Sequence, residues 1–389
     1  MRLRWLGIVL AGLSASACAT TTPLPNVPAH VATAAPHHAP QAPSTALAPS
    51  VTPLDFHNLP GWADDDHRAA FVAFRSTCGA ARAPELSEVC RRARSVGELD
   101  EGQAQAFFEA NFTAEMVAPP GVLTAYFAPE YDARRQPSRE FSAPVRPRPA
   151  DLVNVDAGLF DSAQAGAAGG ALEAGGMLLP YPDRAAIESR PAQKPLAWMR
   201  PEDLFFLQIQ GSGVLTFEDG TRLKANYAGN NGRRFSGVAN AMRDRGLLEA
   251  SNTSGEAIRG WLAAHRGPEA DEIMRLNPRY VFFKLAPDDG NQPVGAAGVP
   301  LPPGRAIAVD TTRHEMGELF WLDAAAPTLS GAFPTYRRLV LALDTGGAIK
   351  GDARADLYMG LGPEAGAEAG RVRHVLKMYR LAPRVGPRL

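Results

Sequence analysis

Apolar residues recur at helical spacing near the start of the region that is expected to fold. Phe71, Phe74 and Cys78 are spaced three and four residues apart, and a run of three aspartates, 64–66, precedes them. Negative charge at the start and an apolar stripe at this spacing predict an amphipathic helix. A second helix is predicted over 101–112, and the aromatic residues of its buried face are Phe107, Phe108 and Phe112.

After these helices the chain changes to short apolar runs punctuated by Gly and Pro, which is typical of strands joined by turns. The predicted strands are 122–127, 204–210, 214–217, 280–285, 305–310, 319–322, 338–344 and 375–381. Glu218-Asp219-Gly220 predicts a hairpin turn, and Thr253 with Glu256 predicts a capping box that opens a helix. The Ala- and Gly-rich stretch 166–176 predicts a flexible surface loop. Such short strands favour closed β-barrels over a doubly wound sheet.

The first 17 residues have the pattern of an export signal, a basic start followed by a short apolar run and small residues. Cys18 comes next, as in bacterial lipoproteins, where the thiol is acylated; the alternative is plain secretion with Cys18 incidental. Residues 18–53 are rich in Ala, Pro, Thr and Ser with almost no charge, so they are predicted to form a flexible linker.

The composition excludes several classes of protein. The 389 residues include 40 Lys and Arg against 41 Asp and Glu, and this balance argues against a nucleic-acid-binding protein. No run of 18 apolar residues follows the N-terminus, so no internal membrane span is expected. We find no Walker A loop, dinucleotide loop, G-x-S-x-G elbow or paired histidines, and we therefore expect no cofactor and no metal ion.

The three cysteines agree with export. If Cys18 carries a lipid, Cys78 and Cys90 remain as a pair twelve positions apart. In an oxidising compartment such a pair predicts a disulfide. A loop of this size would stabilise the fold by roughly 3 kcal/mol in the chain-entropy model.

Three aspartates follow apolar runs or begin them. Asp344 enters a Gly-rich turn, Asp356 begins a further short strand, and Asp310 ends an earlier run. Carboxylates that converge at a barrel mouth suit acid–base chemistry, because burial and mutual repulsion raise one pKa. The residues alone leave open that these aspartates only accept turn N–H groups. Asp344-Thr345-Gly346 also permits an aspartic protease, although the chain lacks a second such loop and dimerisation would have to supply it.

A second cluster combines amides, glycines and an aromatic ring in 208–213 and 226–232. Amide side chains and Tyr faces suit sugar binding. A hairpin with an Asn-Gly turn explains the second stretch equally well.

At these residues the sequence resembles the membrane-bound lytic murein transglycosylase A family. The similarity runs in order over about 260 residues, and its C-terminal part also resembles the 3D domain, named for three aspartates that fall here on Asp310, Asp344 and Asp356. The matching blocks are 123–130, 180–184, 208–213, 227–232, 277–283, 344–351, 356–360 and 362–366.

The resemblance implies an α+β fold that is mainly β. A double-psi β-barrel would comprise 54–137 and 276–389, with helices at its N-terminal end. A second, glycan-binding β-barrel would be inserted as 138–275, with a groove between the two. The resemblance further implies a lipid-anchored protein on the periplasmic face of the outer membrane. Its partners would be peptidoglycan strands, the membrane, and cell-wall synthesis or division complexes as further candidates.

The implied activity is non-hydrolytic cleavage of the MurNAc–GlcNAc β-1,4 bond, which leaves a 1,6-anhydro-MurNAc end. In this family the catalytic acid belongs to an Asp-x-Tyr motif, hence Asp356, with Asp344 and Asp310 supporting it. Substrate contacts are assigned to Thr124, Tyr126, Gln210, Gly211, Ser212, Gly213, Tyr227, Asn231, Gly232 and Lys350. We expect Asp356 to give its proton to the glycosidic oxygen and then to take the C6 hydroxyl proton. A non-catalytic peptidoglycan-binding lipoprotein of the same fold is the alternative.

Overall fold

The computed structural model describes residues 54–249, 252–327 and 333–384, which belong to one compact unit, Val51–Leu389. The predicted signal peptide 1–17, the lipidated Cys18 and the linker 18–53 lie outside the described residues. No helix in the described ranges is long and apolar enough to cross a membrane.

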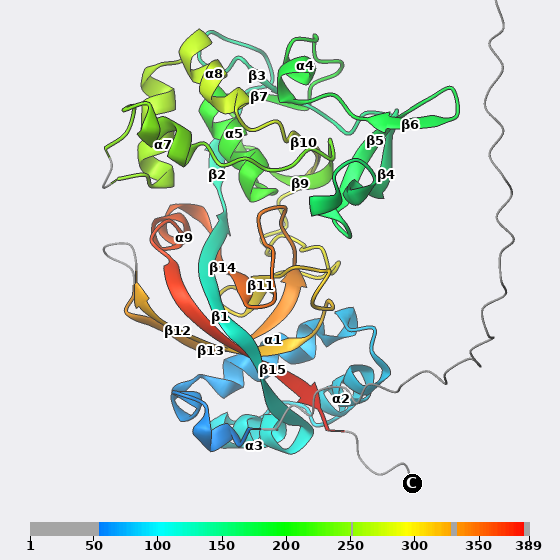
Figure 1. The fold of residues 1–389 in the computed structure, drawn as a ribbon, viewed down its shortest axis with the longest axis vertical. Coiled ribbons are helices and arrows are strands. Elements are labelled where there is room, and N and C mark those ends of the chain that lie inside the picture. Colours follow the sequence, from blue (N-terminus) through cyan, green and yellow to red (C-terminus); the bar gives the residue numbers. More distant parts are fainter. Residues whose placement is uncertain (1–53, 250–251, 328–332, 385–389) are drawn as a thin grey trace, which may run out of the picture. The chain divides into compact units, whose positions relative to one another are not determined.

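Six strands close into a barrel in which two neighbouring pairs are parallel and the others antiparallel, as expected of a double-psi barrel (Figure 1). In order around the barrel they are β1 (Phe112–Ala128), β14 (Arg354–Leu361), β11 (Ala306–Ala308), β13 (Thr335–Asp344), β12 (Leu319–Pro327) and β15 (Arg373–Pro383). Alternate strand residues, among them Leu123, Ile307 and Leu357, pack into one fully buried cluster. The side chains between them point to the opposite face of the sheet.

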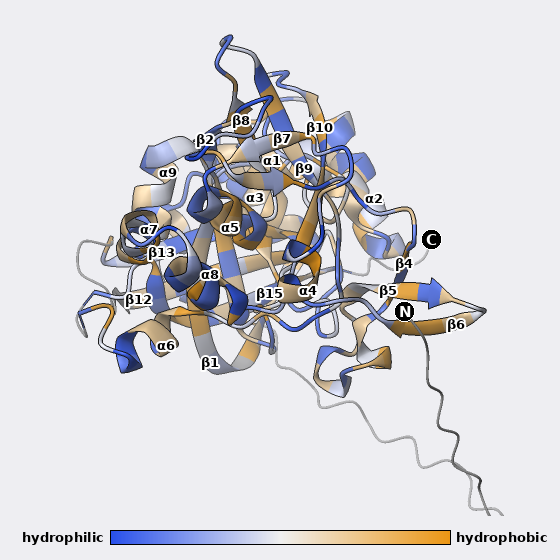
Figure 2. Cartoon of the chain, turned by 90° about the horizontal axis from the view of Figure 1, so that it is seen from above, coloured by the Kyte–Doolittle hydropathy of each residue, from blue (hydrophilic) through white to orange (hydrophobic). Residues whose placement is uncertain are grey.

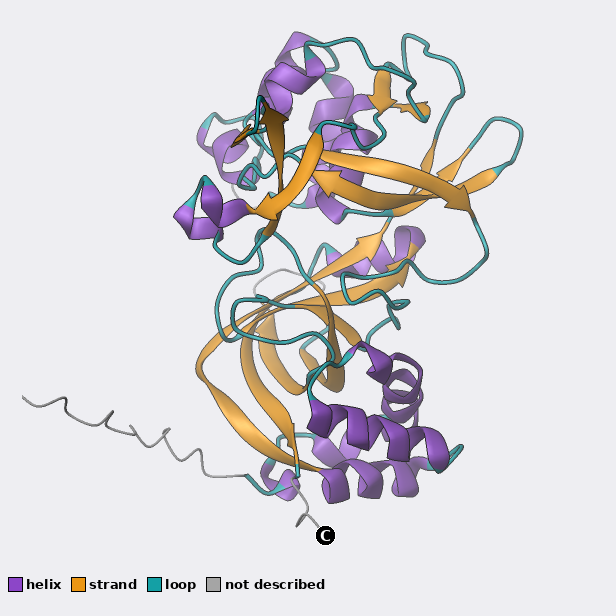
Figure 3. Cartoon of the chain, turned by 90° about the vertical axis from the view of Figure 1, so that its right-hand side faces the viewer, coloured by secondary structure: helices purple, strands orange, loops and turns teal. Residues whose placement is uncertain are grey.

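Three helices cover part of the barrel's outer face: α1 (His67–Thr77), α2 (Pro84–Ser95) and α3 (Glu101–Asn111) (Figure 3). The first and last confirm the predicted helices, although Phe112 already belongs to β1. Helix α2 was not predicted. A disulfide joins Cys90 of α2 to Cys78, which follows α1, with 5.5 Å between their Cα atoms. Short 3-10 helices are η1 (Phe56–Asn58), η2 (Trp62–Asp64), η3 (Cys78–Ala80), η4 (Ala157–Leu159) and η5 (Ser162–Gln164).

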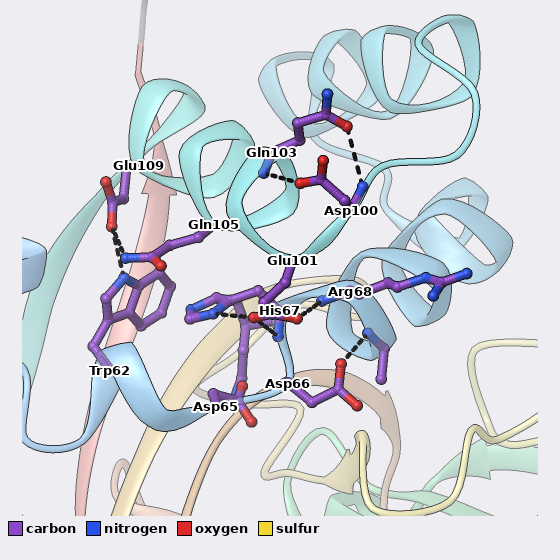
Figure 4. A network of polar contacts seen from close by, with 12 residues as sticks. Trp62, Asp65, Asp66, His67, Arg68, Asp100, Glu101, Gln103, Gln105 and Glu109 are labelled. Carbon is purple, nitrogen blue, oxygen red and sulfur yellow. Dashed lines mark hydrogen bonds and ion pairs between the residues drawn. The ribbon is translucent and has the colours of Figure 1, made fainter.

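A polar network holds the starts of α1 and α3 together (Figure 4). The Glu101 carboxylate accepts hydrogen bonds from the backbone N–H groups of His67 and Arg68, at 2.8 and 3.0 Å. Asp100 and Gln103 form a capping box on α3 itself. Burial acts to raise the pKa of Glu101, but the two backbone hydrogen bonds prevail and lower it. One carboxylate therefore satisfies free donors at the start of a neighbouring helix.

The chain between β1 and β11 forms the second β structure. Strands β10 (Val281–Pro287), β9 (Arg222–Asn230), β8 (Gly213–Thr216) and β2 (Glu130–Asp132) form a four-stranded sheet, and β3 (Ala143–Val145) pairs with β7 (Ala197–Met199). Isolated bridges join Arg134 to Trp198 and Pro147 to Phe283, so the two-stranded sheet links the edges of the larger one into a ring. In place of continuous strand pairing, two isolated β-bridges therefore close the expected second barrel. Its core includes Val145, Leu215 and Phe283.

A three-stranded sheet and five helices complete this region. The sheet comprises β4 (Leu152–Asp156), β5 (Ala168–Ala174) and β6 (Met177–Pro180). Strand β6 is hydrophobic (Figure 2), and its Met177, Leu178 and Leu179 are exposed. The helices are α4 (Arg184–Glu188), α5 (Pro201–Gln210), α6 (Ala239–Asp244), α7 (Gly255–Ala264) and α8 (Pro268–Arg275), while α9 (Gly362–Ala369) follows β14. Strands β2 and β10 pair within this region although the predicted limits, 138–275, leave both outside it.

Two predicted elements are wrong. The run 204–210 is not a strand but lies in α5, which has Pro201 at its first turn and ends at Gly211 in the left-handed conformation. A short apolar run does not distinguish a strand from a buried helix, and these end signals decide. The expected loop 166–176 contains β5, where Gly170 is so close to the Asn230 carbonyl that a side chain would not fit.

The remaining predicted helices, strands and hairpin turn within the described residues are confirmed with small shifts. A hairpin joins β8 to β9 through the predicted turn, where the Gly220 N–H donates to the Phe217 carbonyl. Helix α7 is present, but the predicted capping box of Thr253 with Glu256 is wrong, because Ser254 is the N-cap and its hydroxyl accepts from the Ala257 N–H.

Candidate active site

Four neighbouring barrel strands place one row of residues side by side. Thr124 of β1 is in register with Asp356 of β14, Asp356 with Ala308 of β11, and Ala308 with Asp344 of β13. Since adjacent strands lie about 4.8 Å apart, the two aspartates are separated by about 10 Å at their backbones. The small Ala308 between them leaves room above the sheet.

The strand alternation explains why this row faces away from the barrel core. Ala355 and Leu357, the neighbours of Asp356, are fully buried in that core, as is Leu123 beside Thr124. Asp356 and Thr124 therefore point to the other face. In β13 a register irregularity before Asp344 interrupts the alternation.

A cavity of about 310 Å³ opens at this row, and residues of both β structures line it. The barrel contributes both aspartates, Thr124, Tyr126 and the turn that follows Asp344. The inserted region contributes Gln208, Ile209, Gln210, Gly211, Tyr227, Phe235, Asn277, Arg279 and Val281.

Asp356 is half-buried and lies beside Thr124 of the neighbouring strand β1 and Arg354 of its own strand. The Arg354 Nη2 donates to the Thr124 hydroxyl oxygen at 2.8 Å, and that hydroxyl donates to Oδ1 of Asp356. Since Thr124 has only one hydroxyl proton, this arrangement leaves Oδ2 as the oxygen that can carry the carboxyl proton. Burial raises the pKa of Asp356; the Thr124 hydrogen bond and the Arg354 charge oppose this, and the Asp344 charge adds to it.

Asp344 is held by two donors. The Tyr126 hydroxyl donates to Oδ2 at 2.7 Å, and the Ala296 N–H donates to Oδ1 at 3.0 Å. Burial raises the pKa of Asp344 more than these hydrogen bonds lower it. Two carboxyl groups with raised pKa thus face one cavity, an arrangement that can keep a proton available near neutral pH.

Asp310 and Lys350 do not line this cavity. They pair with each other at 3.5 Å, and the Asp310 carboxylate accepts hydrogen bonds from the N–H groups of Gly351 and Thr312. Although burial acts to raise it, these hydrogen bonds lower the pKa of Asp310. Asp310 therefore stabilises the turn, which is the alternative that the sequence left open. Its position outside the cavity disagrees with a supporting catalytic role for Asp310. The position of Lys350 likewise disagrees with a substrate contact by Lys350.

The predicted amide cluster divides into two groups. Gln210, Gly211 and Tyr227 line the cavity, and the Gln210 side chain accepts from the Phe127 N–H at 3.2 Å. The others, Ser212, Gly213, Asn231 and Gly232, are not among its lining residues. Asn231 is buried, with its amide donating to the carbonyls of Pro182 and Pro278 at 2.9 Å each. The Asn-Gly segment is thus a structural junction.

Sequence reasoning missed two arginines. Arg354 stands two residues before Asp356, so strand alternation could have placed both on one face. Arg279 lies in a matching block, 277–283, yet nothing in that block indicates which side chain faces the cavity.

Comparisons with known proteins agree with this architecture. Residues 122–284 match the family model of the MltA specific insert domain, and residues 305–382 match that of the 3D domain. A curated relative, membrane-bound lytic murein transglycosylase A of Vibrio cholerae, is 32% identical over 265 residues. That match covers 67% of this chain and 65% of the relative, slightly less than two thirds of its length.

Solved structures match more completely. A membrane-bound lytic murein transglycosylase from Agrobacterium tumefaciens is 34% identical with a TM-score of 0.73, over 85% of this chain and 97% of that one. The E. coli MltA structure with bound chitohexaose is 25% identical with a TM-score of 0.60, over 86% and 91% of the two chains.

Proposed function

The chain belongs to the membrane-bound lytic murein transglycosylase A family, and we propose that it cleaves the MurNAc–GlcNAc β-1,4 bond of peptidoglycan without water. The product would be a 1,6-anhydro-MurNAc end. One observation carries the proposal: the half-buried Asp356, whose pKa is raised, faces a cavity that both β structures line.

In the proposed reaction Asp356 acts twice. Its protonated Oδ2 donates to the glycosidic oxygen while the bond between that oxygen and C1 breaks. The C6 hydroxyl of the same MurNAc then bonds to C1, and the Asp356 carboxylate accepts the hydroxyl proton. Because the nucleophile belongs to the substrate, the step is intramolecular, and effective molarities of about 10⁵ M or more become available. No second carboxylate has to activate water.

The neighbours of Asp356 suit both halves of this cycle. Burial raises the pKa of Asp356 and so favours the protonated acid before the first step. Once the proton has left, the Thr124 hydroxyl and the Arg354 charge stabilise the carboxylate.

We expect Asp356→Asn to lower the rate of anhydro-muropeptide release by about 10²–10⁴, the usual contribution of a general acid–base group. The measurement is mass spectrometry of the products released from purified sacculi. Asp352→Asn is the matched control, because this exposed aspartate of the same turn does not line the cavity and its side chain pairs with Arg313 at 3.5 Å. Full activity of the Asp356 variant would reject the assignment, and solvent oxygen at C1 would instead indicate a hydrolase.

The same assay separates the alternatives. A non-catalytic peptidoglycan-binding protein would sediment with sacculi and release nothing soluble. An aspartic protease would yield peptide products. The geometry disfavours a protease site within one chain, since Asp310 is bound by Lys350 and backbone N–H groups and is not available to share a proton with Asp344.

We also propose that Cys18 carries a lipid that anchors the chain to the periplasmic face of the outer membrane, where cell-wall synthesis or division complexes are its candidate protein partners. Cys18→Ser should move the protein from the membrane to the soluble periplasmic fraction. Fractionation followed by immunoblotting tests this, and an unchanged membrane fraction would contradict it.

A further inference from the structure

The cavity contains a cation that the proposed acid–base cycle does not use. Arg279 lines the cavity and is half-buried, and none of the described residues forms an ion pair with its guanidinium. Burial lowers the pKa of Arg279 because the charged form loses hydration. A partly desolvated cation without an anionic partner is costly, so its presence in a cavity indicates an anionic ligand.

The surroundings of Arg279 fix its backbone and leave its guanidinium available. The Arg279 N–H donates to Asn277 at 3.2 Å, and its carbonyl accepts from the buried Arg184 at 2.7 Å. By contrast, the Nη1 atom only reaches the Arg233 carbonyl, at 3.5 Å. The guanidinium lies against Gly347, where an added Cβ would lie 3.5 Å from Nη1. It therefore lies beside the turn that begins at Asp344.

We propose that Arg279 binds a carboxylate of the glycan strand and makes this protein selective for acidic over neutral glycan strands. This inference rests on the proposed function. A guanidinium presents a planar pair of donors that matches a carboxylate. Peptidoglycan offers this group in two places. A peptide-free MurNAc has a free lactyl carboxylate, and a peptide-bearing MurNAc has the carboxylates of its stem peptide. A strand of GlcNAc alone, such as chitohexaose, has none.

Binding to the full-length Asp356→Asn chain tests the proposal without cleavage. Isothermal titration would compare chitohexaose, peptide-free GlcNAc–MurNAc strands and peptide-bearing strands. Adding Arg279→Gln should weaken binding of at least one acidic strand tenfold or more and change binding of chitohexaose less than twofold. Arg279→Lys, which keeps the charge, should restore part of the lost affinity. Arg135→Gln is the matched control, an exposed arginine of the same region that pairs with Asp219.

The two acidic strands identify the source of the carboxylate. If Arg279→Gln weakens binding of peptide-free strands, the carboxylate that Arg279 binds is the lactyl group. If it weakens only the binding of peptide-bearing strands, the carboxylate belongs to the stem peptide. Equal weakening for all three ligands would show that Arg279 only supports the fold, and no change for any ligand would also overturn the proposal. If the wild-type chain released no anhydro product while the charge selectivity persisted, the proposed function would fail and this inference would stand.

Discussion

The acidity of Asp356 is a balance between opposing influences on one side chain. Burial and the neighbouring Asp344 raise its pKa, whereas the Thr124 hydroxyl and the Arg354 guanidinium lower it. Desolvation dominates, as it does for carboxyl groups that serve as acids near neutral pH. Removing either opposing group should therefore make Asp356 a weaker acid.

Thr124→Val deletes the hydroxyl that donates to Asp356 and keeps the shape of the side chain. We expect the pKa of Asp356 to rise further, so the high-pH limb of the rate profile, where the acid loses its proton, moves to higher pH. The rate at the optimum should fall by about 10–100-fold, the value of a hydrogen bond to a charged group. The profile of kcat/KM against pH measures both effects. Thr124→Ser should keep the wild-type profile, and a limb that moved to lower pH would contradict the assignment.

The position of a residue in the site could be predicted from the sequence only where the adjacent residues form a recognisable strand. Asp344 and Asp356 follow or begin apolar strands, and both were expected in the site. Asp310 has the same sequence pattern yet binds Lys350 away from the cavity, because a strand end does not specify which way its last side chain turns. Arg279 reaches the site only through the packing of the inserted region, which no local pattern encodes.

At the scale of elements, strand β1 positions the site. It pairs with β15 from Phe112 onward and with β14 from Val122 onward, and its register shifts between Val117 and Gly121. At Gly121 the backbone lies directly against the Ala353 carbonyl, so no side chain fits there. This close approach sets the register that brings Thr124 opposite Asp356.

Gly121→Ala should therefore disrupt the register of β1 against β14. We expect a loss of about 1–3 kcal/mol or more in the free energy of unfolding, as for other overpacked positions. Activity should fall together with stability. Gly260→Ala is the matched control, because this exposed helical glycine has free space around it and alanine favours a helix by about 1 kcal/mol. Denaturant titration measures both variants, and a Gly121 variant as stable as the wild type would refute the argument.

Elements with a clear buried face were predictable, and those whose apolar run or composition fits more than one state were not. Helix α3 was expected from its aromatic residues, whereas α5 reads as an apolar run and was mistaken for a strand because its end signals at Pro201 and Gly211 were not weighed. Strand β5 was missed because its glycines, which are required by close contact with Asn230 and Gly232, have the composition of a loop.

At the scale of the molecule, the two buried aspartates of the site lower the free energy of unfolding when they ionise. Both carboxyls that face the cavity have a pKa above that of an unfolded aspartate, about 3.9. Below that value both states hold the proton and neither group affects folding. As the pH rises through the folded pKa, the unfolded chain releases the proton more readily, so the native state loses stability. The fold thus contains two carboxyl groups whose ionisation opposes folding, a cost that comes from burying them at the cavity.

Asp356→Asn should therefore be more stable than the wild type at pH 8, although we expect it to lose most of its activity. The amide oxygen can still accept from Thr124, and the ionisation that opposes folding is gone. We expect the melting temperature to rise by about 2 °C at pH 8, the lower end of the shift that 1 kcal/mol produces in domains of 150–250 residues, because this unit, Val51–Leu389, is longer. The difference should vanish at pH 3 and below, where the unfolded aspartate is also protonated. Calorimetry at the two pH values measures this, with Asp352→Asn unchanged at both. A variant that melted below the wild type at pH 8 would mean that ionised Asp356 stabilises the fold and is not the desolvated acid proposed above.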